Sequence, residues 1–304
     1  MPDSVLTSDL VRVPAVRDML ELTKPVTWFP PMWAFLCGVV SSGISLADHW
    51  AFLLAGIALT GPIVCGTSQV INDWCDRHVD SINEPNRPIP SGRVPGRWPV
   101  WIALFGSGLS LALGAALVGW VLAATCVALF CGWAYSSPPF RFKKSGWLGP
   151  LVCALSYEGL SWFTGASVMV GGLPSPAVIA ILLLYSLGAH GIMTLNDFKA
   201  VEGDAQMGVR SLPVQMGVTK AAWTACAFML GSQWVVVALL MQWGSSNAAF
   251  AVLMLSFAQL PLMLKFVQQP IERALSVSAF GVPLFVSGMM VSAWSLRGVE
   301  VVAL

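Results

Sequence analysis

Charged residues are scarce in this sequence. Only 10% of its 304 residues are Asp, Glu, Lys or Arg, whereas 56% are hydrophobic and the mean hydropathy is +0.74. A soluble domain carries roughly 25% charged residues, so a water-soluble globular fold is excluded. The net charge is close to neutral, at +1, and no nucleic-acid partner is expected. The chain is therefore predicted to be an integral membrane protein that lies in a lipid bilayer.

Several signatures of other protein classes are also missing. There are three histidines in all, and no Ser/His/Asp or Cys/His arrangement of the kind used in nucleophilic catalysis. The seven cysteines form no CxxC pair and mostly lie inside apolar runs, which favours small buried hydrophobic roles over metal or disulfide roles. Residues 1–23 are polar, so no cleavable signal peptide is expected.

Long apolar runs make up most of the chain. Nine of them approach the roughly 20 residues that a helix needs to cross a bilayer. They lie near residues 26–47, 49–71, 98–116, 117–135, 148–171, 176–195, 219–242, 247–265 and 276–296. These runs lack the alternation of a membrane barrel, and lipid cannot satisfy free backbone groups. We therefore predict an all-α, polytopic bundle of about nine transmembrane helices. It forms a single domain, 1–304, around a central cavity that opens to the cytoplasmic side.

The basic residues lie almost entirely on one side of these predicted spans. Fifteen of the 16 Lys and Arg residues precede the first span or fall in alternate connections, and Arg297 is the exception. The positive-inside rule places such loops in the cytoplasm. We therefore expect residues 1–24 and the charged loops to be cytoplasmic.

The most charged stretch, residues 71–93, directly follows the second span. Asn72, Asp76 and Asp80 recur every four residues, so a helix would carry them along one face, with Asp73 beside that row. Carboxylates at this spacing repel one another, so a cation is expected to offset them. Oxygen ligands that face a cavity suit Mg²⁺. The alternative interpretation is a solvated loop whose charges only mark the membrane surface.

A second acidic segment, residues 196–211, follows the sixth span. It contains Asp197, Glu202 and Asp204. Asp197 and Asp204 are seven residues apart, so a helix would align them, although Gly203 can interrupt that helix. Both segments begin with Asn-Asp at the end of a span and continue into basic residues. Two such clusters over one site would suit a diphosphate bridged by Mg²⁺, with Arg and Lys on the remaining oxygens.

The candidate residues fall into four groups. For catalysis we name Asn72, Asp76, Asp80, Asp197, Glu202 and Asp204, and for metal binding Asn72, Asp73, Asp76, Asp80, Asp197 and Asp204. For diphosphate binding we name Arg87, Arg93, Arg141, Lys143, Lys199 and Arg210. The alternative for the basic loop at 135–144 is a simple membrane anchor. For the substrate cavity we name Glu158, because intramembrane carboxylates are costly and usually face an interior. We also name Trp162, as part of an aromatic wall, and His190, as a ligand for a chlorin magnesium. Ordinary helix packing is the alternative for these three.

Three segments carry a resemblance to a known family. They are NDWCDRHVDSINEPNRPIPSGR (72–93), AYSSPPFRFKKSGWLG (134–149) and NDFKAVEGDAQMGVRSLPVQMG (196–217). With Asn72, Asp76 and Asp80 in the first, the chain resembles the UbiA superfamily of intramembrane prenyltransferases over essentially its whole length, and in particular the branch that makes chlorophylls and bacteriochlorophylls. The second cluster departs from the DxxxD pattern of many members, because Val201 stands four residues after Asp197.

The resemblance implies esterification of the propionate of bacteriochlorophyllide a with geranylgeranyl or phytyl diphosphate, with Mg²⁺ as cofactor. It further implies a bacterial inner membrane, cytoplasmic or intracytoplasmic photosynthetic, and contact with other pigment-synthesis or antenna-assembly proteins. An allylic diphosphate ionises readily once its leaving group is neutralised, so the catalytic task is mainly electrostatic. Chlorophyllide a, an aromatic ring or haem are alternative acceptors. A polytopic transporter is the alternative from another class.

Overall fold

The structure is a computed structural model and describes residues 13–298. The first twelve residues of the predicted amino-terminal segment lie outside this range. The described residues are mostly helical and contain no β-strand. In chain order the elements are α1 (Val16–Leu22), η1 (Pro25–Trp28), α2 (Phe29–Ser41), α3 (Trp50–Ala58), η2 (Leu59–Cys65), α4 (Gly66–Asn83), α5 (Trp98–Leu117), α6 (Gly119–Ser136), η3 (Phe142–Lys144), α7 (Leu148–Ala154), η4 (Leu155–Leu160), α8 (Ser161–Val170), α9 (Pro176–Thr194), η5 (Leu195–Lys199), α10 (Val201–Gln206), α11 (Leu212–Met216), α12 (Val218–Gln242), α13 (Ser246–Gln268), α14 (Pro270–Ser276), η6 (Val277–Gly281), α15 (Val282–Ser295) and η7 (Leu296–Gly298).

The predicted all-α membrane bundle is confirmed. Seven helices within residues 13–298 are long and apolar enough to cross a membrane: Trp50–Asn83, Trp98–Leu117, Gly119–Ser136, Pro176–Lys199, Val218–Gln242, Ser246–Gln268 and Pro270–Ser295. The two other predicted spans are also helical, over the 13 residues of α2 and over α7, η4 and α8. The nearly continuous apolar run at 98–135 divides at Val118, whose extended backbone separates α5 from α6.

Three of the long helices contain a π-helical turn, at η2, η4 and η6. The turn in η2 includes Pro62, which lacks the N–H that an α-helix needs. Such turns re-aim the side chains that follow them and are frequent at functional sites. Here η2 leads directly into α4, which carries the first acidic segment, so its register sets the directions of the acidic side chains.

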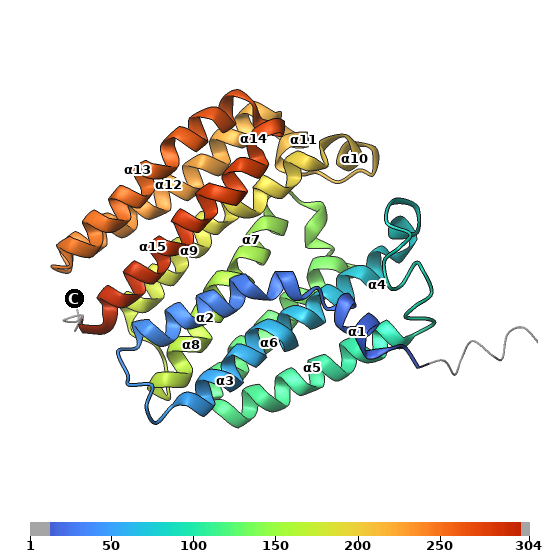
Figure 1. The fold of residues 1–304 in the computed structure, drawn as a ribbon, viewed down its shortest axis with the longest axis horizontal. Coiled ribbons are helices and arrows are strands. Elements are labelled where there is room, and N and C mark those ends of the chain that lie inside the picture. The colour runs from blue at the N-terminus through green and yellow to red at the C-terminus, as the bar shows by residue number, and fades with distance from the viewer. Residues whose placement is uncertain (1–12, 299–304) are drawn as a thin grey trace, which may run out of the picture.

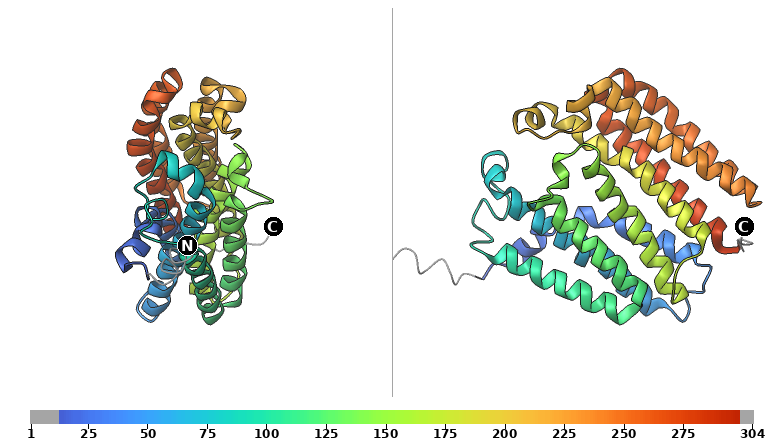
Figure 2. Two further views of the ribbon diagram at one scale, coloured as in Figure 1. Left: turned by 90° about the vertical axis from the view of Figure 1, so that its right-hand side faces the viewer. Right: turned by 180° about the vertical axis from the view of Figure 1, so that it is seen from behind.

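The helices form two packed groups (Figures 1 and 2). In one, α9, α12, α13 and α15 share a large buried cluster that reaches α2 and α8. In the other, α3 to α6 pack around two smaller clusters. The groups are joined where α2 crosses α8. A side-chain carbon at Gly38 would lie 2.0 Å from the Trp162 carbonyl, and one at Gly165 would lie 2.1 Å from the Phe35 carbonyl. Only glycine allows the two backbones to approach so closely.

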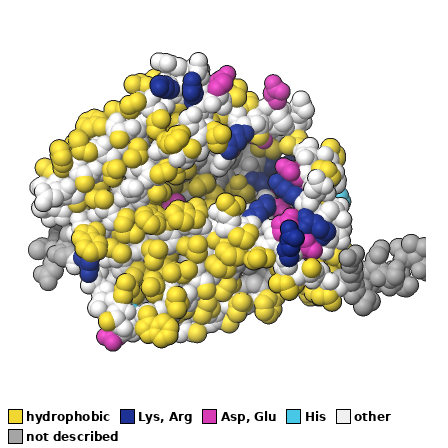
Figure 3. All heavy atoms as spheres, viewed as in Figure 1, with side chains coloured by type: hydrophobic (Ala, Val, Ile, Leu, Met, Phe, Trp, Pro, Cys, Tyr) yellow, Lys and Arg dark blue, Asp and Glu magenta, His cyan; other side chains and the backbone are white. Residues whose placement is uncertain are grey.

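Charge is segregated on the surface. Large apolar side chains such as Phe105, Phe250 and Phe280 are exposed along the helices, as lipid-facing residues are. Lys, Arg, Asp and Glu gather instead at the end of the molecule where α4 and α10 lie, and the surface is hollowed there (Figure 3). The candidate residues of both acidic segments lie at this end.

Candidate active site

The acidic residues of the first segment lie on α4, which runs without a break from Gly66 to Asn83. Successive side chains on an α-helix are rotated about the helix axis by about 100°. Side chains four residues apart therefore differ in direction by about 40°, and side chains seven residues apart differ by about 20° in the opposite sense. Asp73 and Asp80 therefore point in nearly the same direction, and Asn72 and Asp76 point in a neighbouring one. The predicted row of Asn72, Asp76 and Asp80 covers about 80° of the helix surface, and its last residue, Asp80, contacts the same arginine as Asp73.

The side of α4 that carries Asn72 and Asp76 contacts the basic loop between α6 and α7. The Asn72 amide donates to Asp76 Oδ2 at 3.2 Å and to Ser136 Oγ at 3.0 Å. The Lys143 ammonium group forms an ion pair with Asp76 Oδ1. Asp76 is thus held by an amide on its own helix and by a cation from a segment 67 residues away.

The side of α4 that carries Asp73 and Asp80 is more deeply buried, and other cations neutralise its carboxylates. Lys24 Nζ lies 2.6 Å from Asp73 Oδ1, and an Arg87 guanidinium nitrogen lies 2.9 Å from Asp80 Oδ2 and 3.6 Å from Asp73 Oδ1. Burial by itself would lower the pKa of Arg87, but the neighbouring carboxylates raise it above its ordinary value. These ion pairs form a structural network that holds Lys24, before α2, and Arg87, after α4, against the helix.

The basic loop adopts a constrained backbone. Arg141 lies in the left-handed region at φ 44°, and so does Lys24 at φ 47°. They are the two non-glycine residues with positive φ among residues 13–298, and this conformation costs roughly 1–2 kcal/mol. The Arg141 Nε atom is buried and has no hydrogen-bond partner within the described chain. Strained backbone of this kind persists where surrounding contacts enforce it, and it clusters at ligand sites.

The same loop is joined by its backbone to the second acidic segment. The Arg210 N–H donates to the Lys144 carbonyl at 3.0 Å, and the Gly146 N–H donates to the Arg210 carbonyl at 2.7 Å. A side-chain carbon at Gly146 would lie 2.4 Å from the Leu212 nitrogen, so only glycine permits this pairing. The loop therefore bridges the two acidic segments, with Lys143 reaching the first.

The second acidic segment is not one continuous helix. Ala200, at φ −122° and ψ 14°, separates η5 from α10, so the predicted alignment of Asp197 and Asp204 on one helix is wrong. The break falls at Ala200 rather than at Gly203. Burial raises the pKa of the Asp204 carboxyl group.

The other predicted basic and acidic residues occupy different positions. Arg93 does not face α4: its guanidinium group lies 2.6 Å from Asp18 and 2.7 Å from Glu21, and so ties α1 to the loop after α4. The hydrogen bond from Arg93 lowers the pKa of Glu21. Its predicted role in diphosphate binding stays a prediction, and in this structure its donors contact Asp18, Glu21, Ser91 and Asn86. Lys199, Glu202 and Arg210 are exposed at the same end of the molecule.

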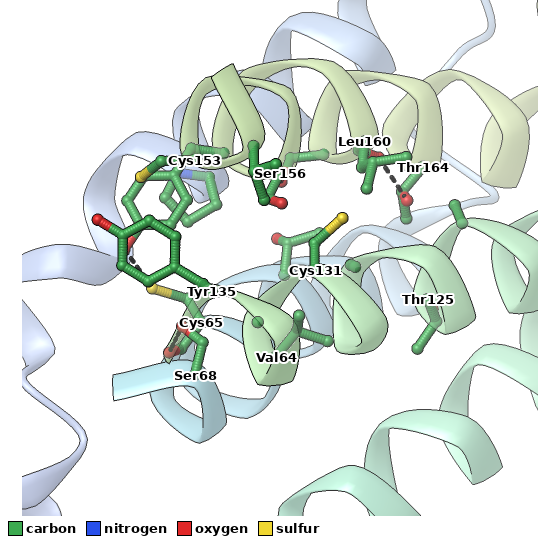
Figure 4. A pocket seen from close by; sticks show the side chains of 18 of the residues that line it. Val64, Cys65, Ser68, Thr125, Cys131, Tyr135, Cys153, Ser156, Leu160 and Thr164 are labelled. Atoms are coloured by element: carbon green, nitrogen blue, oxygen red, sulfur yellow. Dashed lines mark hydrogen bonds between the residues drawn. The ribbon is translucent and has the colours of Figure 1, made fainter. Parts of the chain in front are cut away.

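An apolar cavity of about 250 Å³ opens beside Asn72 and runs between α3–η2–α4, α6 and α7–η4–α8. Its lining residues follow its length. Asn72, Tyr135 and Cys153 lie toward one end together with Cys65, Gln69 and Tyr157, and Leu160, Thr125 and Thr164 lie toward the other. Figure 4 shows Tyr135 and Cys153 at one end and Thr125 and Thr164 at the other. The Tyr157 hydroxyl accepts a hydrogen bond from Gln69 Nε2 at 2.9 Å.

Sequence reasoning missed most of this cavity. Gln69 stands one turn before Asn72, and Tyr135 and Tyr157 are two of only three tyrosines in the chain. These polar side chains in otherwise apolar spans were the sequence feature that could have indicated the cavity. Three cysteines, Cys65, Cys131 and Cys153, also line the cavity, although the sequence suggested only hydrophobic packing for them.

The three residues predicted to line a substrate cavity do not line this one. Trp162 is fully buried; its Nε1 donates to Ser41 Oγ at 3.1 Å and its ring stacks on Tyr185. His190 packs between two aromatic rings, with Nε2 3.2 Å from the Trp147 carbonyl oxygen. Glu158 is buried on the side of η4 away from the cavity, and its Oε2 has no partner within residues 13–298. Helix packing, the alternative interpretation, accounts for Trp162 and His190.

This combination of a helical membrane bundle, two acidic segments and an apolar cavity between them matches a known family. The model of the UbiA prenyltransferase family matches residues 28–289. This chain belongs to that family and is a prenyltransferase.

Two relatives and one solved structure extend the match. The chain is 53% identical to the bacteriochlorophyll synthase 33 kDa chain of Cereibacter sphaeroides, over 95% of this chain and 96% of the relative. It is 49% identical to the protein of the same name from Rhodobacter capsulatus, with the same shares covered. The structure of a UbiA homologue from Archaeoglobus fulgidus bound to GPP and Mg²⁺ superimposes with a TM-score of 0.64 at 21% identity, over 93% of this chain and 100% of the other.

Proposed function

We propose that this protein is a bacteriochlorophyll synthase. It transfers a geranylgeranyl or phytyl group from its diphosphate to the propionate of bacteriochlorophyllide a and releases diphosphate. The observation that carries the proposal is the apolar cavity that opens at Asn72, beside Asp76 and Lys143. A prenyl diphosphate has an apolar chain and a charged diphosphate head, so it needs an apolar cavity that adjoins a charged site. The 53% and 49% identity to relatives of that name supports the acceptor.

The residues at the mouth of the cavity fit Mg²⁺. Magnesium in proteins takes one or two carboxylates together with substrate phosphates, so a complete protein cage is not needed. Asn72 and Asp76 would supply oxygen ligands from the first segment, and Asp197 and Asp204 would supply them from the second. A bound Mg²⁺ would neutralise phosphate oxygens and stabilise the diphosphate as a leaving group.

The chain's own residues position and shield the reacting groups. Lys143 and Arg141 are placed to hold phosphate oxygens, and Arg141 Nε has a free donor for this purpose. The bond between C1 of the prenyl chain and the diphosphate oxygen breaks, and its electron pair leaves with diphosphate. A propionate oxygen then forms the new bond to C1. A carboxylic acid with an ordinary pKa near 4 is already ionised at pH 7, so no general base is required. The apolar lining of the cavity keeps water from the prenyl chain.

The membrane setting follows from the same arrangement. The acidic and basic residues lie at one end of the bundle, and the positive-inside rule places that end in the cytoplasm. We therefore place the protein in a bacterial inner or intracytoplasmic photosynthetic membrane, with its site at the cytoplasmic surface. Association with other proteins of pigment synthesis or antenna assembly is part of the same proposal.

An acceptor panel tests the proposal. Membranes that contain the protein are supplied with Mg²⁺, geranylgeranyl diphosphate and one of bacteriochlorophyllide a, chlorophyllide a or 4-hydroxybenzoate. We expect the esterified pigment with bacteriochlorophyllide a, resolved by chromatography at the absorption band of the macrocycle. Preference for chlorophyllide a would replace the proposed acceptor with its close relative. Product only from 4-hydroxybenzoate would overturn the tetrapyrrole assignment.

A further inference from the structure

A second hollow lies at the opposite end of the molecule from the charged site. It is an open groove of about 660 Å³ between the turn that joins α12 to α13 and the last turns of α15. Figure 1 shows the start of α13 and the end of α15 at this end, away from α4 and α10. The function proposed above uses none of the residues that line the groove, so the groove needs an explanation of its own.

The floor of this groove is apolar, and small residues leave the space for it. Ala249 on α13 is fully buried in the core, whereas Ala248 and Ala251, on a neighbouring side of the helix, are half-buried and line the groove. Met290 and Val291 of α15 line its other side. An acyl chain fits such a floor, because its van der Waals contacts would fill the space that the two alanines leave.

The rim of the groove is polar and carries no acidic side chain. It consists of Gly244, Ser245, Ser246, Asn247 and Ser295, and none of the residues that line the groove is Asp or Glu. Serine hydroxyl groups and the asparagine amide can donate hydrogen bonds to an oxygen anion. From floor to rim the groove therefore changes from apolar to polar, as expected at the boundary between lipid and water.

Arg297 supplies a positive charge beside this rim. Its guanidinium group lies 4.4 Å from the centroid of the Trp294 ring, and Trp294 lines the groove with 63% of its side chain exposed. Among residues 13–298, no carboxylate forms an ion pair with Arg297. A guanidinium group that stacks on an aromatic ring keeps the N–H donors along its edge for a phosphate group.

We propose that this groove binds one phospholipid with an anionic head group, from the membrane leaflet opposite the active site. The acyl chain lies along Ala248, Ala251 and Met290, and the phosphate is bound by Arg297 and the polar rim. A free phosphate would gain nothing from the apolar floor, and a zwitterionic lipid would bring a positive ammonium group close to Arg297. The proposal is independent of the proposed function. It assigns the lipid a stabilising role, because a ligand that binds only the folded state raises the free energy of unfolding.

Native mass spectrometry of the delipidated protein tests the preference for an anionic head group. Phosphatidylglycerol and phosphatidylcholine with the same acyl chains are titrated separately. We expect the first phosphatidylglycerol to bind about tenfold more tightly than the first phosphatidylcholine, because a hydrogen bond to a charged group contributes about this factor. Arg297→Gln should remove the preference, and Arg297→Lys, which keeps the charge, should retain most of it.

A charge removed elsewhere is the control for Arg297. Arg273 is exposed on α14, at the other end of the bundle, so Arg273→Gln should keep the wild-type preference for phosphatidylglycerol. The same preference in Arg297→Gln as in wild type, or no preference in wild type, would overturn the proposal.

A second pair of variants tests the apolar floor. In Ala251→Phe the ring fills the groove, and we expect both lipids to bind about tenfold more weakly. Ala116→Phe is the matched control, because Ala116 is exposed on the last turn of α5, at the same end of the bundle; it should bind both lipids as wild type does. If Ala251→Phe does not accumulate in membranes, the Arg297 variants decide alone.

A phosphatidylglycerol with a photoreactive acyl chain locates the bound lipid. We expect its adducts on the peptides that contain Ala251 and Met290, and we expect Ala251→Phe to abolish them. Adducts confined to the other end of the bundle would contradict the proposal. So would a copurifying polypeptide that covers the groove in place of lipid.

Discussion

The Lys143 ammonium group forms an ion pair with Asp76 across 67 residues of sequence. The loop that carries Lys143 is also hydrogen-bonded through Lys144 and Gly146 to the backbone of Arg210. One short loop thus contacts both acidic segments at the mouth of the apolar cavity. This relationship makes several outcomes testable.

Replacing Asp76 should remove activity without unfolding the protein. In Asp76→Asn the shape is kept, but the charge that Lys143 and a metal ion recognise is lost. Removing one preorganised electrostatic contact typically lowers kcat by about 10²–10³-fold, and we expect a loss of this size in the esterification assay. Glu84→Gln is the matched control, since Glu84 is acidic, near the same helix and 58% exposed; it should retain near wild-type turnover. Full activity in Asp76→Asn would rule out the assigned role.

Replacing Lys24 should mainly lower stability. Asp73 is almost completely buried and Lys24 is its shortest ionic contact, so Lys24→Met leaves a buried carboxylate with only the longer contact to Arg87. Removing one partner of a buried pair costs up to about 3–5 kcal/mol, which a thermal unfolding scan in detergent would detect. The double variant Lys24→Met/Asp73→Asn should recover part of the loss. An exposed lysine, Lys220→Met, serves as the control, and equal melting temperatures for both single variants would contradict the network.

Adding one methyl group to Gly146 should disconnect the two acidic segments. The new carbon would lie 2.7 Å from the Arg210 carbonyl oxygen as well as close to Leu212, so the loop must move away. We expect Gly146→Ala to lower kcat by about tenfold or more, since small displacements of positioned groups can cost about 10²-fold. Gly108→Ala, where nothing lies within 4 Å, should have wild-type kcat. Wild-type turnover in Gly146→Ala would show that the bridge is dispensable.

The contact of Arg93 with Glu21 should be sensitive to acid. The folded-state pKa of Glu21 lies below its ordinary value of 4.5, so its contribution to stability is present above that value. It is lost as the pH falls through the folded pKa. The melting temperature of wild type should therefore exceed that of Glu21→Gln at pH 7, and the difference should shrink as the pH falls from 4.5 through the lower folded-state pKa of Glu21. A difference that stays constant as the carboxyl group is fully protonated would mean that charge is not its source.

Hydrophobic runs and the placement of basic residues sufficed to predict the helical bundle, because run length is a property of each segment alone. The same holds for the helix that carries Asn72 to Asp80. The direction of each side chain was harder to predict. The spacing of four predicted a row of Asn72, Asp76 and Asp80, but it did not indicate that Asp80 and Asp73 would share Arg87.

Contacts between distant segments could not be read from the sequence. Lys24 resembled any basic residue near a membrane surface, yet it neutralises Asp73. Trp162 and His190 were plausible cavity residues, but Ser41 and Trp147 occupy their polar atoms. The cavity itself depends on how three helices pack, and this explains why Gln69 and Tyr157 were missed.

The central claim is that one diphosphate contacts both acidic segments. It is tested most directly by measuring the Mg²⁺-dependent affinity for a 20-carbon thiodiphosphate in wild type, Asp76→Asn, Asp197→Asn and the double variant. The account predicts that each single variant binds at least about tenfold more weakly, and that the double variant loses less than the product of the two, as expected for residues that share a ligand. Wild-type affinity in Asp197→Asn would contradict it.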